Sequence, residues 1–323
     1  MDFIARTDID DSAWDACVAS APNGIVYGYT WYLDAVLSAP GWKWIGLVLL
    51  DEQGGYRAVM PVPLRQKRLA GITFGWVVHQ PFFCQLLAVF STEAIDPTPF
   101  LLRIQQQFRY GSRLHQRQLI RVDHETQIEK IATHVLDLSV GYESLISRYS
   151  SDRKTNLRRA ATTNWVVTNA IDLDPLVYLF RNHHADSIKG GVADWSYEVF
   201  ATVANELLKR GLGFLRYAVL DGNIEAGAFF TREGNRIIYL FNAASEIGRK
   251  KNARTLLIDQ VIREYSGKPV TFDFESPVKP SIVQFYRSFG AVEEPFWLIR
   301  WNRLALPKRV LFKFYRLTQG YLG

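Results

Sequence analysis

Residues 271–290, TFDFESPVKPSIVQFYRSFG, contain the strand and helix around which we expect the second half of the chain to fold. Apolar and acidic residues alternate at the start of this stretch: Phe272, Asp273, Phe274 and Glu275. Because successive side chains of a strand point to opposite faces, the alternation predicts a short strand over Val270–Phe274. It also predicts that Asp273 and Glu275 share one face of that strand.

The same stretch predicts a helix that begins after two prolines. Pro277 and Pro280 break the strand, and proline is favoured at the first position of a helix. The helix carries Tyr286 and ends at Gly290. Acidic residues at a strand end, followed directly by a helix with a tyrosine, indicate a functional site at the carboxyl end of the strand. The alternative is an ordinary β–turn–α unit whose aromatic residues belong to the core.

Length suggests the number of domains, and net charge suggests the kind of partner. A chain of 323 residues, at roughly 150 residues per domain, suggests two domains. The net charge of +6 and the isoelectric point of about 9.2 favour anionic partners. A phosphate-rich cofactor, an RNA or an anionic membrane surface would each fit this charge.

The two cysteines, Cys17 and Cys84, are isolated among apolar neighbours. Their spacing matches neither a metal-ligand pattern nor a disulfide framework, which indicates a reducing compartment and no metal. The N-terminal sequence lacks the layout of a signal peptide. No uncharged apolar run approaches the ~20 residues of a membrane helix. We therefore expect a cytoplasmic protein.

The first half predicts helices that alternate with a series of strands. The expected helices are Ser12–Ala21, Thr30–Ala39 and Thr98–Tyr110; the expected strands are Trp44–Leu50, Tyr56–Leu64, Thr73–Val78, Phe82–Phe90, Gln118–Val122 and His134–Leu138. Pro61 and Pro63 interrupt the second strand, and proline in a strand demands an edge position or a bulge.

The second half shows a clearer succession of elements. The expected strands are Trp165–Ala170, Gly213–Leu220, Ile224–Thr231, Ile237–Ala243 and Phe296–Trp301; the expected helices are Asp174–His184, Ser196–Arg210 and Asn252–Tyr265. Asp221-Gly222 is a strong hairpin-turn signal between two of the strands.

The order of elements in the second half broadly echoes that of the first half. We therefore predict an α/β (α+β) protein with two tandem domains, each a mixed, mostly antiparallel sheet flanked by helices. The expected domains are residues 1–137 and 138–306, followed by a basic aromatic tail at 307–323. The tail is either a helix packed on its own domain or a membrane-surface helix.

A basic segment, Tyr142–Ala160, lies at the start of the second domain and predicts two helical pieces. Its cations are Arg148, Arg153, Lys154, Arg158 and Arg159. The segment is either a solvated helix face or an electrostatic site for phosphates or RNA.

The second half resembles the GCN5-related N-acetyltransferase (GNAT) family in its full order of elements. Members of that family commonly carry a tyrosine four residues before a glycine in the helix after the fifth strand. Here that helix has Tyr286 and Gly290, with Ala291 in place of the usual phenylalanine. The two-domain length, the Asp273-Phe274 pair and the segment S-x-R-x-x-N-L-R-R-A from Ser151 are similar to the Fem-type branch. Those proteins are tandem GNAT domains that transfer aminoacyl groups from tRNA to peptidoglycan precursors.

The resemblance implies a loop that binds the pyrophosphate of coenzyme A (CoA), typically Q/R-x-x-G-x-G/A. Its glycines let backbone N–H groups approach the phosphates at a helix N-terminus. The corresponding stretch here is GRKKNA, with one displaced glycine and three basic residues that could hold phosphate instead. The implied CoA-binding residues are Ala243, Ala244, Gly248, Arg249, Lys250, Lys251, Asn252 and Ala253.

The resemblance also implies roles in catalysis. A backbone N–H at Asn242 or Ala243, where the fourth strand of the family bulges, would stabilise the oxyanion. Tyr286 would protonate the leaving group, and Asp273 or Glu275 would accept the proton of the attacking amine or orient it. A phenol of pKa ~10 matches a departing thiol better than a sugar hydroxyl. The sequence therefore favours an acyl-CoA (acetyl-CoA) donor over aminoacyl-tRNA.

The acceptor is expected to be a small or cell-envelope-related amine. Lys189, Trp195 and Tyr197 follow a helix end at His183 and His184, in a glycine-containing loop that would close over this acceptor. Three functions remain open at this point: an N-acyltransferase with acyl-CoA, a Fem-type aminoacyl or peptidyl transferase with tRNA, and a non-catalytic binding module.

Overall fold

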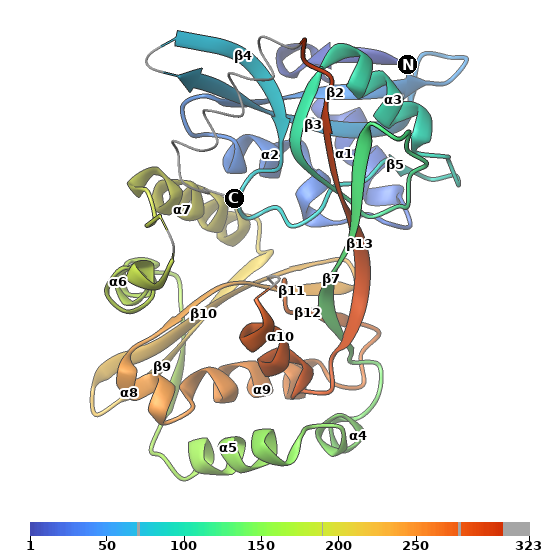
Figure 1. Cartoon of the computed structure of the whole chain (residues 1–323). Coiled ribbons are helices and arrows are strands. Elements are labelled where there is room, and N and C mark those ends of the chain that lie inside the picture. Colours follow the sequence, from blue (N-terminus) through green and yellow to red (C-terminus); the bar gives the residue numbers. More distant parts are fainter. Residues whose placement is uncertain (70–71, 189, 277–278, 306–323) are drawn as a thin grey trace. The chain divides into compact units, whose positions relative to one another are not determined.

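The computed structural model describes residues 1–69, 72–188, 190–276 and 279–305, and the chain divides into two compact units (Figure 1). Unit 1 contains Met1–Ile131, Glu198–Val203 and the chain from Pro295; unit 2 contains Ala132–Tyr197 and Ala204–Glu294. The tail predicted at 307–323 lies outside the described residues. No helix of the described part is long and apolar enough to cross a membrane.

Unit 1 is built on a sheet with the strand order β1-β2-β3-β4-β6-β13 and with β5 beside β3. The strands are β1 (Asp2–Ala5), β2 (Trp42–Leu50), β3 (Tyr56–Leu69), β4 (Ile72–His79), β5 (Phe90–Ser91), β6 (Tyr110–Gln116) and β13 (Val292–Asn302). The helices are α1 (Asp11–Ser20), α2 (Thr30–Val36) and α3 (Thr98–Gln107), with short 3-10 turns at Arg6–Asp8 and Val26–Gly28. The three predicted helices are confirmed.

The prolines of β3 lie where the strand has one described neighbour. Gly46 and Trp44 of β2 pair with Pro61 and Pro63 on one side. On the other side β5 pairs only with residues 58–59 and β4 only from Leu64 onward. The prolines therefore occupy a local edge inside a long strand, as their missing N–H groups require.

Two strands predicted in unit 1 are wrong. Of Phe82–Phe90 only its last residue is in a strand, and Gln118–Val122 is irregular chain. Side-chain amides take the place of a ladder there: Gln80 Nε2 donates to the Cys84 carbonyl at 2.6 Å, and Gln118 Nε2 donates to the Val89 carbonyl at 3.0 Å. A buried apolar run has the same composition in either conformation, so periodicity could not distinguish them.

Unit 2 has the strand order β7-β12-β11-β10-β9-β8. The strands are β7 (Thr126–Asp137, which begins in unit 1), β8 (Val166–Ala170), β9 (Gly213–Leu220), β10 (Asn223–Glu233), β11 (Arg236–Ala244) and β12 (Thr271–Asp273). The helices are α4 (Tyr142–Ser147), α5 (Ser151–Ala161), α6 (Asp174–His183), α7 (Asp194–Lys209), α8 (Glu246–Lys250), α9 (Ala253–Tyr265) and α10 (Pro280–Arg287), with a 3-10 turn at Ala185–Ser187. Only β11 and β12 pair in parallel. The predicted mixed, mostly antiparallel sheet is confirmed.

The hairpin of β9 and β10 follows from its two turn residues. Asp221 and Gly222 both have positive φ, 49° and 82°. A two-residue type I′ turn requires this conformation, and its twist matches that of the flanking strands.

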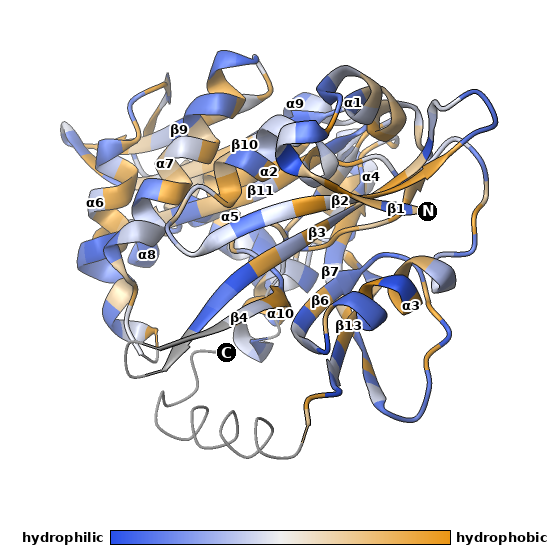
Figure 2. Ribbon diagram, turned by 90° about the horizontal axis from the view of Figure 1, so that it is seen from above, coloured by the Kyte–Doolittle hydropathy of each residue, from blue (hydrophilic) through white to orange (hydrophobic). Residues whose placement is uncertain are grey.

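Helices cover both faces of the unit 2 sheet (Figure 1). Helix α9 packs Leu257 and Val261 into one core with Phe230 and Phe272 of the strands. On the opposite face α6 packs Phe180 against Phe241, with ring centroids 4.7 Å apart. Because both faces are covered, β10 and β11 are largely hydrophobic (Figure 2).

Helix α8 occupies the segment that was predicted as the phosphate loop. Ser245 caps it by accepting a hydrogen bond from the Gly248 N–H at 2.9 Å. Gly248 itself is buried against β10, where a Cβ atom would overlap the carbonyl oxygen of Glu225. Glycine is therefore needed here for the packing of α8 against a strand.

We predict that Gly248→Ala destabilises the protein by about 1–3 kcal/mol, because a methyl group at this place forces α8 away from β10. Thermal unfolding of the two proteins measures the effect. Gly141→Ala is the matched control, since a Cβ atom at Gly141 has open space and an ordinary φ of −64°. Equal melting temperatures for the Gly248→Ala variant and wild type would contradict this packing role.

Candidate active site

Strands β11 and β12 separate soon after they begin to pair. Their parallel register runs from Arg236↔Thr271 to Ile238↔Asp273 and stops there. Strand β11 continues for six more residues to Ala244, whereas β12 ends. The N–H and C=O groups of β11 that face β12 beyond this point are left without a ladder partner in the described sheet. His184 and Arg249 bond those of Ala244, and the groups before Ala244 are available to a ligand.

A β-bulge lies in β11 directly after the separation. Phe229 pairs with Phe241 and Phe230 pairs with Tyr239, which leaves Leu240 as the extra residue. The predicted bulge at Asn242 therefore occurs two residues earlier. An extra residue reverses the alternation of faces, so Tyr239 and Asn242 lie on the same side, that of α9.

Tyr286 of α10 lies on that same side. Its ring stacks on Phe274 with centroids 4.6 Å apart, and it meets Tyr239 edge to face at 6.3 Å. The residue is only 6% exposed. Burial raises the pKa of Tyr286 above the ordinary phenol value, and the charge of Glu275 acts in the same direction. The phenol is therefore fully protonated at neutral pH.

Arg254, in the first turn of α9, joins this group, and sequence reasoning missed it. Its Nη1 donates to Asn242 Oδ1 at 3.1 Å, and its guanidinium carbon is 5.6 Å from the Phe285 ring centroid. Its positive charge partly offsets the effect of burial on the pKa of Tyr286 and of Tyr239. The only sequence signal was its position directly after the predicted phosphate loop.

The two carboxylates predicted for the acceptor side are not equivalent. Asp273 is 0% exposed and faces away from Tyr286. Its carboxylate accepts from Arg236 Nη1 at 2.5 Å, from the Thr133 hydroxyl at 2.6 Å and from the Glu275 N–H at 2.9 Å. These bonds engage both carboxylate oxygens, so this geometry suits a structural role.

Glu275 is the carboxylate on the side of Tyr286. The prediction that it shares a face with Asp273 is wrong, because Glu275 has a φ of 46° and leaves the strand conformation. The left-handed residue turns the chain after β12. A role for Glu275 near an attacking amine stays a prediction.

The residues predicted to bind CoA fall into two groups. Ala243, Ala244, Gly248 and Ala253 are buried. Gly248 packs against β10, so the glycine cradle that a pyrophosphate needs is not formed there. By this test the segment does not fit the pyrophosphate of CoA in the manner the family resemblance implied.

The polar members of the predicted loop also have protein partners. Arg249 Nη1 donates to the Ala244 carbonyl at 3.1 Å, and Lys250 pairs with Glu246 at 2.7 Å. Lys251 is exposed, and Asn252 has a φ of 61° just before α9. The side chain of Asn252 makes no capping bond to α9.

His184 is a second residue near the site to which the sequence gave only a helix-end role. Its Nε2 accepts a hydrogen bond from the Ala244 N–H at 3.0 Å. Burial, followed by the charge of Arg254, lowers the pKa of His184 to about 4. The neutral imidazole therefore ties the end of α6 to the end of β11.

The residues predicted for the acceptor loop differ in their surroundings. Lys189 lies outside the described residues. Tyr197 is buried, with the Arg181 guanidinium 4.2 Å above its ring and Phe180 6.2 Å away. Trp195 is half-buried near the start of α7. Their role with an acceptor stays a prediction.

One member of the basic segment is buried. Arg153 is 6% exposed and lies 4.2 Å from the Phe285 ring and 4.5 Å from the Phe289 ring. Its Nε donates to Ser288 Oγ at 2.9 Å, and burial lowers its pKa to about 10. Arg153 thus anchors α10 on α5, while Arg148, Arg158 and Arg159 are exposed.

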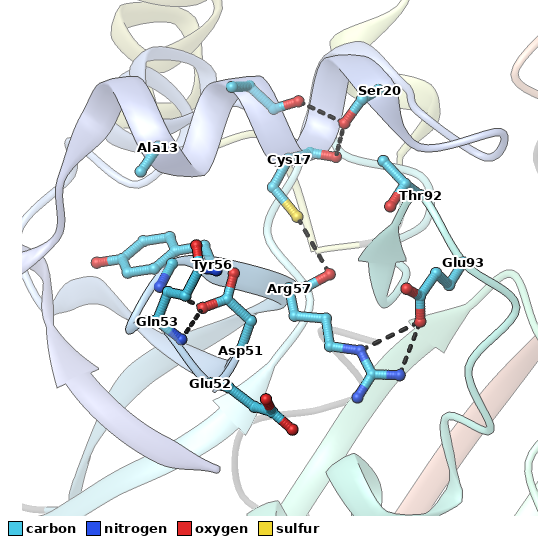
Figure 3. A pocket seen from close by; sticks show the side chains of 12 residues that line it. Ala13, Cys17, Ser20, Asp51, Glu52, Gln53, Tyr56, Arg57, Thr92 and Glu93 are labelled. Atoms are coloured by element: carbon cyan, nitrogen blue, oxygen red, sulfur yellow. Dashed lines mark hydrogen bonds and ion pairs between the residues drawn. The ribbon is translucent and has the colours of Figure 1, made fainter.

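A pocket of about 700 Å³ lies in unit 1, beneath α1 (Figure 3). None of the predicted site residues lines it. Several of its polar groups are paired with one another or with the backbone: Arg57 bonds Glu93 at 2.7 Å, and Asp51 accepts from the N–H groups of Gln53 and Gly55 at 2.8 Å. No group of His, Cys, Asp and Glu side chains in the described residues is arranged to hold a metal ion.

The bulge in β11 and the tyrosine of α10 are two features that the resemblance to the GNAT family implied. Residues 147–276 match the family model of the acetyltransferase (GNAT) domain. No curated protein matches the sequence significantly.

Solved structures share the fold over the whole chain at low identity. A crystal structure of FemX has a TM-score of 0.63 and 12% identity, covering 99% of this chain and 100% of that one. The C-terminal domain of a putative lysylphosphatidylglycerol synthetase from Agrobacterium fabrum has a TM-score of 0.53 and 14% identity, with coverage of 99% and 100%. A tandem GNAT protein from the clavulanic acid biosynthesis pathway has a TM-score of 0.50 and 13% identity, with coverage of 93% and 97%.

Residues 147–276 therefore match the GNAT domain, and the chain as a whole shares its fold with FemX and with a tandem GNAT protein.

We predict that His184 makes the stability of the protein depend on pH between about 6.5 and 4. Its pKa is lower in the folded chain than in the unfolded one. Its contribution is therefore complete above pH 6.5 and is lost as the pH falls toward 4. His184→Gln removes the titration, so its difference in melting temperature from wild type should shrink between pH 7 and pH 4.5.

The matched control is His183→Gln, at the adjacent exposed histidine. Its difference from wild type should be the same at both pH values. A pH-independent effect of His184→Gln would contradict the assignment of a neutral, hydrogen-bonded imidazole.

Proposed function

We propose that unit 2 transfers an acyl group from an activated ester to an amine, with Tyr286 as the proton donor to the leaving group. The observation that carries this proposal is the position of the Tyr286 phenol beside the bulge of β11, where β11 and β12 separate. The class of reaction agrees with the GNAT domain of residues 147–276.

In this mechanism the nitrogen of the acceptor amine attacks the carbonyl carbon of the donor. A C–N bond forms, and the carbonyl electron pair moves to the oxygen. The oxyanion then collapses, the C–O bond to the carrier breaks, and the departing oxygen takes the proton of Tyr286. The attacking amine gives a proton to Glu275, and Glu275 passes a proton to Tyr286, directly or through water, so that both groups regain their starting state.

Backbone N–H groups and an arginine side chain support stabilisation of the oxyanion. Alternate N–H groups of β11 beyond Ile238 point toward the edge that β12 has left, and preorganised backbone N–H groups act without reorganisation during the reaction. The Arg254 guanidinium, held by Asn242 at 3.1 Å, adds positive charge on the same side.

The raised pKa of Tyr286 favours an ester donor. A thiol is a stronger acid than an alcohol, so a departing thiolate gains little from a phenol that holds its proton tightly. A departing sugar alkoxide is more basic and takes the proton readily. The sequence favoured acyl-CoA on the basis of an unperturbed phenol, and burial of Tyr286 reverses that comparison.

The packing of Gly248 supports the same choice. Because β10 fills the space beside this glycine, the chain lacks the usual cradle for the CoA pyrophosphate. An aminoacyl ester of tRNA is the donor class that fits both observations. Among proteins of the same fold, the lysylphosphatidylglycerol synthetase is named for a product that carries a lysyl group.

Transfer from acyl-CoA is the second candidate, and the start of α9 favours it. No side chain caps this helix at Asn252, so the first N–H groups of α9 are open to an anion. Lys251 is exposed directly before it. A phosphate bound there would rely on helix N–H groups and lysine in place of glycines.

We predict that Tyr286→Phe lowers the turnover number by about 10²-fold, because the leaving group loses its proton donor. Donor affinity should stay near that of wild type, since the ring and its stacking on Phe274 remain. Steady-state kinetics and equilibrium binding separate the two quantities. Tyr178→Phe, at an exposed tyrosine of α6, is the control; unchanged turnover in Tyr286→Phe would remove this residue from the mechanism.

The donor is tested by offering two labelled donors with one panel of primary amines. We expect labelled product from a pool of aminoacyl-tRNA and none from acetyl-CoA. Product from acetyl-CoA alone would overturn the ester donor and establish the second candidate. If neither donor reacts and neither shifts the melting temperature at saturating concentration, unit 2 is a binding module.

A further inference from the structure

One face of the unit 1 sheet gathers basic and aromatic side chains from neighbouring strands. Residues directly opposite each other in a sheet, and residues two apart along a strand, share a face. Trp42 lies opposite Arg65, Arg65 opposite Val77, and His79 opposite Arg113. We call the resulting set the Trp42–Arg113 face: Trp42, Arg65, Lys67, His79 and Arg113.

Trp42 is in contact with two other members of this face. The guanidinium carbon of Arg65 is 5.1 Å from the Trp42 ring centroid, and the rings of Trp42 and His79 are 5.5 Å apart. His79 Nδ1 lies 2.6 Å from the Ser112 hydroxyl. The part of β3 that leads toward β4 is correspondingly hydrophilic (Figure 2). Trp42 thus joins a cation and a second ring on this face.

Arg113 is half-buried on this face without a counter-charge. Among the described residues no carboxylate lies within 4.0 Å of its guanidinium, whereas the neighbouring Arg300 pairs with Glu129 at 3.2 Å. Burial, and then the charge of Arg300, lowers the pKa of Arg113. A partly buried cation without a carboxylate is costly, and an anionic ligand would remove that cost.

The pKa of His79 reflects the same concentration of positive charge. Burial lowers its pKa to about 2, and the charges of Lys67, Arg65 and Arg113 act in the same direction. The charges that act on His79 most strongly are all basic. The imidazole is therefore neutral and adds a ring and a nitrogen to a surface whose charge comes from the lysine and the arginines.

We propose that the Trp42–Arg113 face binds a phosphate-bearing ligand through Arg65, Lys67 and Arg113, with Trp42 packing against its non-phosphate part. Arginine presents a planar set of donors that matches phosphate oxygens, and lysine adds a point charge. The tryptophan offers an apolar ring for a base or sugar. This site lies in unit 1, and the proposal does not depend on the acyl transfer proposed for unit 2.

The test measures binding of inorganic pyrophosphate and of ADP to the full chain by titration calorimetry. We expect both to bind, and Arg113→Gln to weaken them about tenfold, which corresponds to about 1.4 kcal/mol. Glutamine keeps donor groups and removes the charge, so this variant should remain folded, with a melting temperature at or above that of wild type. Arg109→Gln, at an exposed arginine just before β6, is the matched control and should leave the affinity unchanged.

A decauridylate RNA separates two sources of the phosphate. If the RNA competes with pyrophosphate, the ligand is a nucleic-acid phosphodiester. If it does not compete, the ligand is a nucleotide or free pyrophosphate. Both outcomes support a phosphate site on this face. Equal weakening by Arg113→Gln and Arg109→Gln would instead indicate diffuse attraction by a basic protein and would overturn the proposal. Absence of pyrophosphate and ADP binding at low salt would also overturn it.

Discussion

The ion pair between Arg236 and Asp273 holds the part of unit 2 on which the candidate site depends. The two side chains meet at 2.5 Å at the point where β11 and β12 stop pairing. Arg236 also binds Glu294 at 2.5 Å, and Asp273 accepts the Thr133 hydroxyl and the Glu275 N–H. Removing one partner of such a buried pair costs about 3–5 kcal/mol. The pair therefore fixes the end of β12 and the turn at Glu275 that follows it.

The separation of the strands and the bulge act together. The separation leaves one side of β11 open, and the extra residue at Leu240 brings Asn242 to the same face as Tyr239. Helices α9 and α10 then supply Arg254 and Tyr286 to that face. A regular strand would have placed Asn242 on the side of α6, so one inserted residue determines which groups meet.

Local signals in the sequence predicted most elements of the fold. The Asp221-Gly222 hairpin, the prolines of β3 and the helix at Tyr286 all depend on backbone conformations that a few residues impose. The strands expected at Phe82–Phe90 and Gln118–Val122 failed because burial, not strand geometry, produced their apolar pattern. In the candidate site, Tyr286 and Asn242 were found by their order in the chain. Arg254 and His184 were missed because their partners lie far away in the sequence.

The sequence by itself determined most of the helices and strands and the helix that carries Tyr286, because these follow from periodicity and turn chemistry. Only the tertiary structure decided the side on which each polar group acts. Asp273 and Glu275 look alike in the sequence, yet one is buried against Arg236 and the other follows a left-handed turn toward Tyr286. Gly248 resembled a phosphate-loop glycine, yet the Glu225 carbonyl occupies its space. Such outcomes depend on contacts between distant segments, which no local pattern encodes.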